Sequence, residues 1–295
     1  MKCRAESFQV CSVYWRTSLG IIRSSGGRDM PRGLRFSVGG RLVRRLATLY
    51  CMGEPSIGVR LRSLHVRMLL RNETWRSAVD IGCGTGGVIG WCGGLPTTIF
   101  LLAVYHREAH LTGADRDQTA IFRNAELVRK AGIYNLNFRR LDLLDQINSD
   151  MEKQEVVIMA DVVANRPNDE RLIAGAFRLV RPGGRLILHV PSRHPPRSIS
   201  RSNDEPDRLG VGYAEPELAG ALLRMGADNV VMRRTFGRFG RLAVDTYRRF
   251  LIRGRLFAVL IFPVALLIAL PDVLFTNSEG DGILVVASMP AEKWE

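Results

Sequence analysis

One acid and three glycines at alternate positions form the pattern in this sequence that is most typical of a ligand site. Asp80, Gly82, Gly84 and Gly86 end or follow the apolar stretch 77–81, and residues that favour a helix come next. Glycine permits a tight turn and lets a ligand lie directly against the backbone, so this spacing after a predicted strand indicates a nucleotide-type cofactor. Glycine turns without ligands are also common. The acid narrows the chemistry, because a carboxylate repels a pyrophosphate but suits a cationic ligand.

Further acids come directly after later predicted strands. The strands are expected at 110–114, 136–141 and 156–160, and they lead into Asp115, Asp142 and Asp161. Nucleotide sites place an acid about 20 residues beyond the glycine turn, where it binds the ribose hydroxyls. Asp115 lies 35 residues beyond Asp80, which indicates an insertion around residues 93–102. Asp117 is an alternative to Asp115, and Asp145 is an alternative to Asp142. The simpler interpretation is that Asp115 is an ordinary turn aspartate and that Asp142 caps a helix or lies in a loop.

The elements that would position these acids alternate between strand and helix. Residues 118–132 form a clear amphipathic pattern that ends at Gly132, a predicted helix C-cap. The run 156–160 is continuously apolar, as in a strand buried on both faces of a parallel sheet. Further helices are expected at 57–70, 170–179 and 215–226, and further strands at 185–191, 229–234 and 282–288. This order predicts an α/β protein with a mostly parallel sheet.

Three stretches resemble the class I methyltransferases that use S-adenosylmethionine, in particular the group that methylates small molecules and lipids. They are Asp80 with its glycines, the segment 160–169 after the fourth strand, and the Arg-Pro-Gly-Gly turn at 181–184. The resemblance implies a Rossmann-like sheet of seven strands, mostly parallel with an antiparallel last strand and helices on both faces. Many relatives have Glu-His where this chain has Ala164 and Asn165, so no catalytic residue is assigned.

The same resemblance implies which residues contact S-adenosylmethionine. The acid of the glycine turn would face the positively charged methionine part, Asp115 the ribose, and Asp142 the adenine amine with Leu143 against the ring. The full set of cofactor-binding positions implied is Asp80, Gly82, Cys83, Gly84, Gly86, Asp115, Arg116, Asp142, Leu143 and Asp161.

The composition limits which binding partners and metal sites are expected, but it does not identify the acceptor. The net charge is +13 and the pI about 10.3, so the chain is attracted to something anionic, but no nucleic-acid-binding motif accompanies the arginines. The 5 cysteines show no zinc-type spacing, which predicts a reducing compartment and no metal. Cys83 is expected to fill space within the glycine turn, because no histidine is close to it in sequence.

The two ends of the chain differ from the predicted sheet domain, 76–295. Residues 1–40 are rich in arginine and serine, which predicts disorder or an organelle-targeting segment, and residues 41–75 are expected to form helices that cap the cofactor site. Within 250–275, the run 256–270 contains no charge and follows several arginines. It is short of the ~20 residues that span a bilayer, so we expect an interfacial contact with an anionic membrane, or otherwise an apolar helix pair packed on the domain.

These observations predict an enzyme that transfers a methyl group from S-adenosylmethionine to a small acceptor, apolar or resident in a membrane. We expect it to be cytoplasmic and peripheral at the inner face of a membrane. Two other classes stay open. One is a cofactor-binding protein without catalysis; the other is a nucleic-acid methyltransferase, although the sequence lacks the Asn-Pro-Pro-Tyr-like motif of enzymes that methylate base amines.

Overall fold

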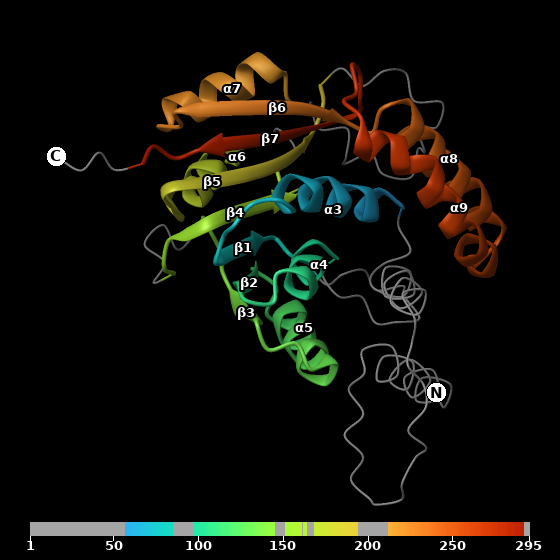
Figure 1. Cartoon of the computed structure of the whole chain (residues 1–295), viewed down its shortest axis with the longest axis horizontal. Helices are drawn as coiled ribbons and strands as arrows, with labels where there is room; N and C mark the ends of the chain where they lie inside the picture. The colour runs from blue at the N-terminus through green and yellow to red at the C-terminus, as the bar shows by residue number, and fades with distance from the viewer. Residues whose placement is uncertain are drawn as a thin grey trace, which may run out of the picture.

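The computed structural model describes residues 57–84, 97–144, 151–160, 162–163, 168–193 and 212–291. Seven strands form one sheet in the order β3-β2-β1-β4-β5-β7-β6 (Figure 1). They are β1 (Ser77–Ile81), β2 (His110–Asp115), β3 (Leu136–Arg140), β4 (Gln154–Ala160), β5 (Val180–Pro191), β6 (Asn229–Thr235) and β7 (Gly282–Ser288). β7 lies between β5 and β6 and runs antiparallel to both, whereas the other strands run in one direction. The predicted fold class is confirmed.

Helices cover both faces of the sheet in the described part of the chain. They are α3 (Ile57–Leu70), α4 (Thr97–Tyr105), α5 (Gln118–Ala131), α6 (Asp169–Arg178), α7 (Glu215–Arg224), α8 (Arg238–Arg253) and α9 (Arg255–Leu274). The helix expected at 118–132 is confirmed. Asp117 caps its first turn, and Gly132 ends it in the left-handed conformation at φ 68°.

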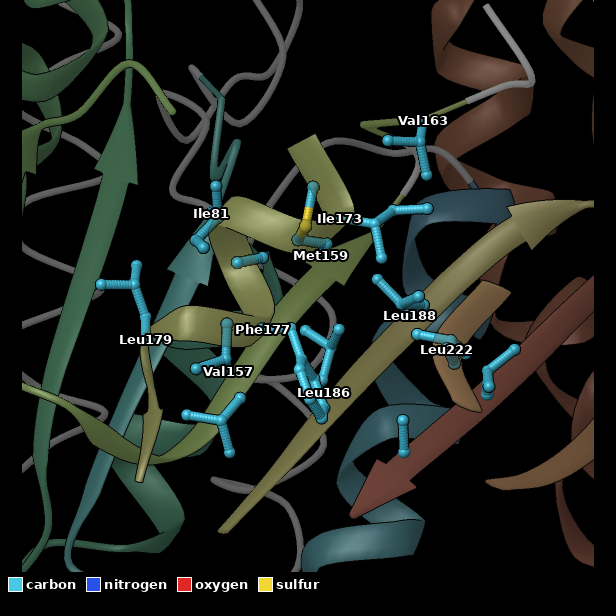
Figure 2. Close-up of a cluster of buried hydrophobic side chains, with 14 of the residues drawn as sticks. Ile81, Val157, Met159, Val163, Ile173, Phe177, Leu179, Leu186, Leu188 and Leu222 are labelled. Atoms are coloured by element: carbon cyan, nitrogen blue, oxygen red, sulfur yellow. The ribbon is translucent and has the colours of Figure 1, made fainter. Parts of the chain in front are cut away.

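Two apolar cores hold the layers together. On one face Val157 and Leu186 of the central strands pack against Phe177 of α6 and Leu222 of α7 (Figure 2). On the other face the sheet packs against α3, α4 and α5 through residues such as Phe100. Because β1 and β4 carry core side chains on both faces, their buried stretches, 78–81 and 156–159, are apolar except at Asp80.

The Arg-Pro-Gly-Gly segment differs from its predicted role. The sequence predicts a turn at 181–184 before a strand at 185–191, but α6 ends at Arg178 and the strand begins earlier, where Val180 pairs with Gln154. The next pair in register is Val156 with Arg185, so the proline and glycines form a bulge inside β5. Gly183 lies at φ 73°, and a side chain on Gly184 would approach the carbonyl oxygen of Glu155 to 2.8 Å.

Helices α8 and α9 form an antiparallel hairpin between β6 and β7, and both pack on α3 (Figure 1). Their shared core consists mainly of small and aromatic residues: Ile57, Leu61, Ala243, Tyr247, Ala258, Phe262, Ala265 and Ala269. The apolar run 256–270 therefore lies in a helix that buries one side against the domain. Among the described residues, no helix combines the length and the apolar character needed to cross a membrane.

Candidate cofactor site

The strand registers bring most of the predicted site residues to one edge of the sheet. Ile81 pairs with Ala114 of β2 and with Met159 of β4, and Asp115 pairs with Arg140 of β3. The carboxyl ends of these four parallel strands are therefore aligned. Ligands of open α/β sheets bind outside such an edge, at the position where the strand order reverses. Here the reversal falls between β1 and β4.

The turn after β1 is built from backbone that only glycine adopts readily. Gly82 and Gly84 lie at φ 71° and 65°. The amides of Gly82 and Cys83 donate to the carbonyl oxygen of Ala114 at 2.8 and 3.1 Å, which ties the turn to the end of β2. A side chain on Gly82 would come within 2.4 Å of a methyl group of Val162. Conformation and space together thus keep Gly82 free of a side chain, and conformation favours glycine at position 84.

Asp115 holds the same turn from the neighbouring strand. Its Oδ2 accepts a hydrogen bond from the Gly84 amide at 2.8 Å, and its Oδ1 accepts one from the Asp117 amide at 3.0 Å. A carboxylate has about four acceptor positions, so both oxygens retain capacity for a hydroxyl donor. Asp117, the alternative ribose acceptor, caps α5 by accepting from the Thr119 amide at 2.8 Å. This structural role accounts for Asp117.

Asn124 completes the support of the turn and was missed in the sequence. Its side-chain amide donates to the carbonyl oxygen of Gly84 at 2.8 Å, and the residue is fully buried. Within the described part of the chain its Oδ1 has no hydrogen-bond partner. A signal was present, because Asn124 lies four residues after Ala120 and four before Val128, on the buried face of α5. A polar residue in that row indicates a specific hydrogen bond.

Asp80 is a buried acid at the carboxyl edge of the sheet, and its pKa is strongly raised. It belongs to the central strand β1, pairs with Gly113 and Ile158 on its two sides, and is buried. Burial raises the pKa of Asp80 from 3.8 to about 7; the backbone amide of Ile99 in α4 opposes this rise and the charge of Asp115 adds to it. In the described part of the chain, no cationic side chain is among the groups that shift this pKa, and the charge of Asp115 adds to that of Asp80. Such a site favours a positively charged ligand.

Cys83 behaves as the sequence predicted for a space-filling residue. Burial, followed by the nearby Asp80 and Asp115, raises the pKa of its thiol well above the ordinary value. Its sulfur lies close to Gly113, where an added side chain would meet it at 3.2 Å. A thiol with a raised pKa is a poor nucleophile at neutral pH.

The remaining predicted positions fall into three groups. Asp142 follows β3 and accepts from the Leu144 amide at 3.0 Å, while Leu143 is buried beside Gly175 of α6. Arg116 is exposed next to Asp115. The predicted Gly86 and Asp161, the alternative Asp145, and the altered Ala164 and Asn165 lie outside the described residues.

The residues present fit S-adenosylmethionine. The buried carboxyl group of Asp80 suits the amino group and sulfonium, and the bare turn at Gly82 and Gly84 allows close approach of the ligand. Asp115 ends β2 and Asp142 follows β3, in the order in which a ribose and an adenine would extend along the edge. In the described part of the chain, no group of three or more histidine, cysteine or acidic residues is arranged to hold a metal ion.

The strand order, the antiparallel β7 and the glycine turn after β1 define the architecture of class I methyltransferases. Residues 79–186 match the family model of a methyltransferase domain. Residues 79–186, which include Asp80, Asp115 and Asp142, are therefore similar in sequence to a methyltransferase domain. No curated protein matches the sequence.

Solved structures share this fold at low sequence identity. Phosphoethanolamine N-methyltransferase 2 of Haemonchus contortus, in complex with S-adenosyl-L-methionine, has a TM-score of 0.52 and 17% identity over 77% of this chain and 52% of its own. This chain thus spans about half the length of that enzyme. The plantazolicin methyltransferase BpumL has a TM-score of 0.50 and 14% identity over 98% of this chain and 100% of its own. The [4+2]-cyclase SpnF has a TM-score of 0.50 and 16% identity over 79% and 81%.

Proposed function

We propose that this protein transfers a methyl group from S-adenosylmethionine to a small acceptor that is apolar or resident in a membrane. The observation that carries the proposal is the buried Asp80 behind a glycine turn at the reversal point of the sheet. Burial destabilises the ionised form of this carboxyl group, whose pKa is about 7, and a bound cation would stabilise that form in place of the missing solvent. S-adenosylmethionine supplies that cation together with a methyl group that its sulfonium already activates.

Each proposed contact follows from what the side chain can donate or accept. Asp80 would accept from the ammonium group and favour the sulfonium electrostatically. Asp115 would accept from the ribose hydroxyls while it continues to hold the Gly84 amide. Asp142 would accept from the adenine amine, with Leu143 as the apolar neighbour. Gly82, Cys83, Gly84, Gly86, Arg116 and Asp161 complete the proposed set, with the glycines providing backbone that a ligand can approach.

For such a transfer, the protein needs mainly to align the acceptor atom with the methyl group. An activated methyl group reacts in line when the acceptor atom is held close to it and water is excluded. Val163 is buried and Val162 is packed against the core at this edge, so both would help to keep water from the bound methyl group. A general base is needed only where the acceptor atom carries a proton that must leave. We therefore assign binding roles and no catalytic residue.

The nature of the acceptor rests on the sequence of α9 and its surroundings. The run 256–270 contains no charge, and arginines precede it. A chain with this surface would meet apolar acceptors at an anionic membrane. Lipids, quinones and polyenes are acceptors of this kind, and the protein would contact the membrane peripherally.

Calorimetric titration of the full chain with S-adenosylmethionine tests the cofactor assignment. We expect saturable binding to the wild type, loss of binding in Asp80→Ala, and no binding of NADH. Asp228→Ala is the matched control, because this exposed acid lies before β6, at the opposite edge of the sheet. Equal binding by wild type and Asp80→Ala would refute the assignment. Absence of binding by a folded wild type would do so as well.

A second function, cofactor binding without methyl transfer, is favoured by two observations. Ala164 and Asn165 replace the Glu-His of many relatives, and a [4+2]-cyclase shares the fold. Incubation with radiolabelled S-adenosylmethionine and a lipid extract separates the two functions. Label in the organic phase supports methyl transfer, whereas tight binding with no labelled product from lipid, quinone or polyene acceptors supports binding alone.

A further inference from the structure

The hairpin of α8 and α9 carries an exposed apolar stripe along its second helix. The stripe consists of Phe257, Leu260, Val264, Leu267, Leu270 and Leu274, which are spaced by three or four residues and therefore share one face of the helix. Leu260 and Leu267 each expose 65% of their surface. The opposite face of α9 is buried in the core with α3 and α8. Helices that face water usually present polar residues on this side, so the stripe requires a partner.

The charge around the stripe indicates what kind of partner it is. Helix α8 has five arginines and one acid, Asp245, and no charged residue lies between Arg255 and Asp272 of α9. Arg238, Arg248, Arg249 and Arg253 are exposed. Ile252, at the tip of the hairpin, is 87% exposed beside Arg253. Apolar residues that enter the acyl boundary, next to arginines that bind phosphates, are the combination that an anionic bilayer surface attracts.

The base of the hairpin is held rigidly at the edge of the sheet that carries the cofactor site. Asp272 is fully buried and accepts hydrogen bonds from the amides of Phe236 and Gly237 at 3.0 and 2.6 Å. His65 of α3 contacts the same carboxylate at 3.1 Å. Helix α8 leaves the carboxyl end of β6, and the chain returns into β7 where Gly282 pairs with Pro191, the end of β5. A surface bound through the hairpin therefore lies on the carboxyl side of the sheet.

We propose that the outer face of the α8–α9 hairpin is a docking surface for an anionic phospholipid bilayer. The stripe of α9 lies in the interface plane along the helix, which is about 30 Å long, and the arginines of α8 contact lipid phosphates. The bilayer then faces the carboxyl edge, so an acceptor dissolved in it reaches the methyl group without crossing water. This last step rests on the proposed methyl transfer, whereas the docking itself does not.

The test measures binding of the full-length protein, without cofactor, to sedimented vesicles. The vesicles contain phosphatidylcholine alone or equal parts of phosphatidylcholine and phosphatidylglycerol. We expect at least tenfold stronger binding to the anionic vesicles, reduced by high salt. Leu260→Asp with Leu267→Asp should lower binding tenfold or more. Arg249→Glu with Arg253→Glu should lower it at least roughly 25-fold, because each arginine lost near an anionic surface contributes roughly fivefold and each new glutamate adds repulsion.

Matched controls carry the same chemical changes away from the hairpin. Phe122→Asp alters an exposed apolar residue of α5, and Arg171→Glu with Arg178→Glu reverses two exposed charges of α6. Both controls should bind anionic vesicles within about twofold of the wild type. Circular dichroism and the S-adenosylmethionine titration show whether each variant is folded.

Three results would overturn the docking surface. The first is a wild type that does not bind anionic vesicles. The second is hairpin variants that bind them as strongly as the wild type. The third is a control, Arg171→Glu with Arg178→Glu, that loses as much binding as Arg249→Glu with Arg253→Glu. A wild-type dimer that Leu260→Asp with Leu267→Asp converts to a monomer, without vesicle binding, would assign the stripe to a second copy. A protein that binds S-adenosylmethionine but no vesicles refutes only the docking. One that binds vesicles but no S-adenosylmethionine refutes only the methyl transfer.

Discussion

Replacing Asp80 by asparagine should stabilise the cofactor-free protein and weaken its binding of S-adenosylmethionine. The substitution keeps the size of the side chain and removes the charge. The pKa of Asp80 is 3.8 when exposed and about 7 in the fold. Because the folded pKa is raised, the stabilising effect of the neutral carboxyl group is complete below about pH 4 and is lost as the pH rises to about 7. A difference of about three units corresponds to about 4 kcal/mol of lost stability above that pH.

Urea unfolding at about pH 5.5 and about pH 8 measures this loss. The contribution of Asp80 should fall by about 2 kcal/mol between these values, because the unfolded group is ionised throughout this interval whereas the folded group retains its proton up to about pH 7. Asp80→Asn should lack that fall and should exceed the wild type in stability at the higher pH. Asp228→Asn, an exposed acid before β6, is the control and should retain the wild-type pH dependence. An identical pH dependence for Asp80→Asn and wild type would refute the raised pKa.

Ligand binding should show the opposite response to the same substitution. A cation binds the ionised carboxylate, so the affinity of the wild type for S-adenosylmethionine should drop by up to tenfold per pH unit below about pH 7. Asp80→Asn should bind weakly at every pH. Calorimetry at several pH values measures both effects. An affinity of Asp80→Asn equal to that of the wild type at about pH 8 would contradict the role of the charge.

The other predictions concern the supports of the site and the hairpin. Gly82→Ala should cost about 2–3 kcal/mol, because it combines a left-handed φ with the contact to Val162. Gly226 lies at φ 99° in open space, so Gly226→Ala should lose only the stability that the left-handed backbone costs. An equal loss of stability to urea in Gly82→Ala and Gly226→Ala would show that the contact with Val162 costs nothing. Asn124→Leu should cost about 1 kcal/mol and weaken S-adenosylmethionine binding through loss of the hydrogen bond to Gly84; unchanged affinity in calorimetry would exclude this support. Asp272→Ala should cost about 3 kcal/mol in urea unfolding, because it leaves the amides of Phe236 and Gly237 without their acceptor; a loss below about 1 kcal/mol would show that the hairpin is held otherwise.

The sequence by itself determined the fold class and the order of the elements. The acids after strands, the glycine turn and the continuous apolar runs are local patterns, and the parallel sheet follows from their alternation. The candidate cofactor residues could be named for the same reason, since each stands next to a recognisable strand end. Their roles remain predictions, because no local pattern shows what a side chain contacts.

Tertiary structure decided what depends on partners that are distant in sequence. The pKa of Asp80 is set by burial between β2 and β4, which no neighbour of Asp80 in the sequence reveals. The position of Pro182 in a bulge depended on the register of β5 with β4. His65 and Asp272 are 207 residues apart, and their contact fixes the hairpin to α3. Only this packing decided which face of α9 is buried and which is left exposed, because the apolar run itself surrounds the helix on every side.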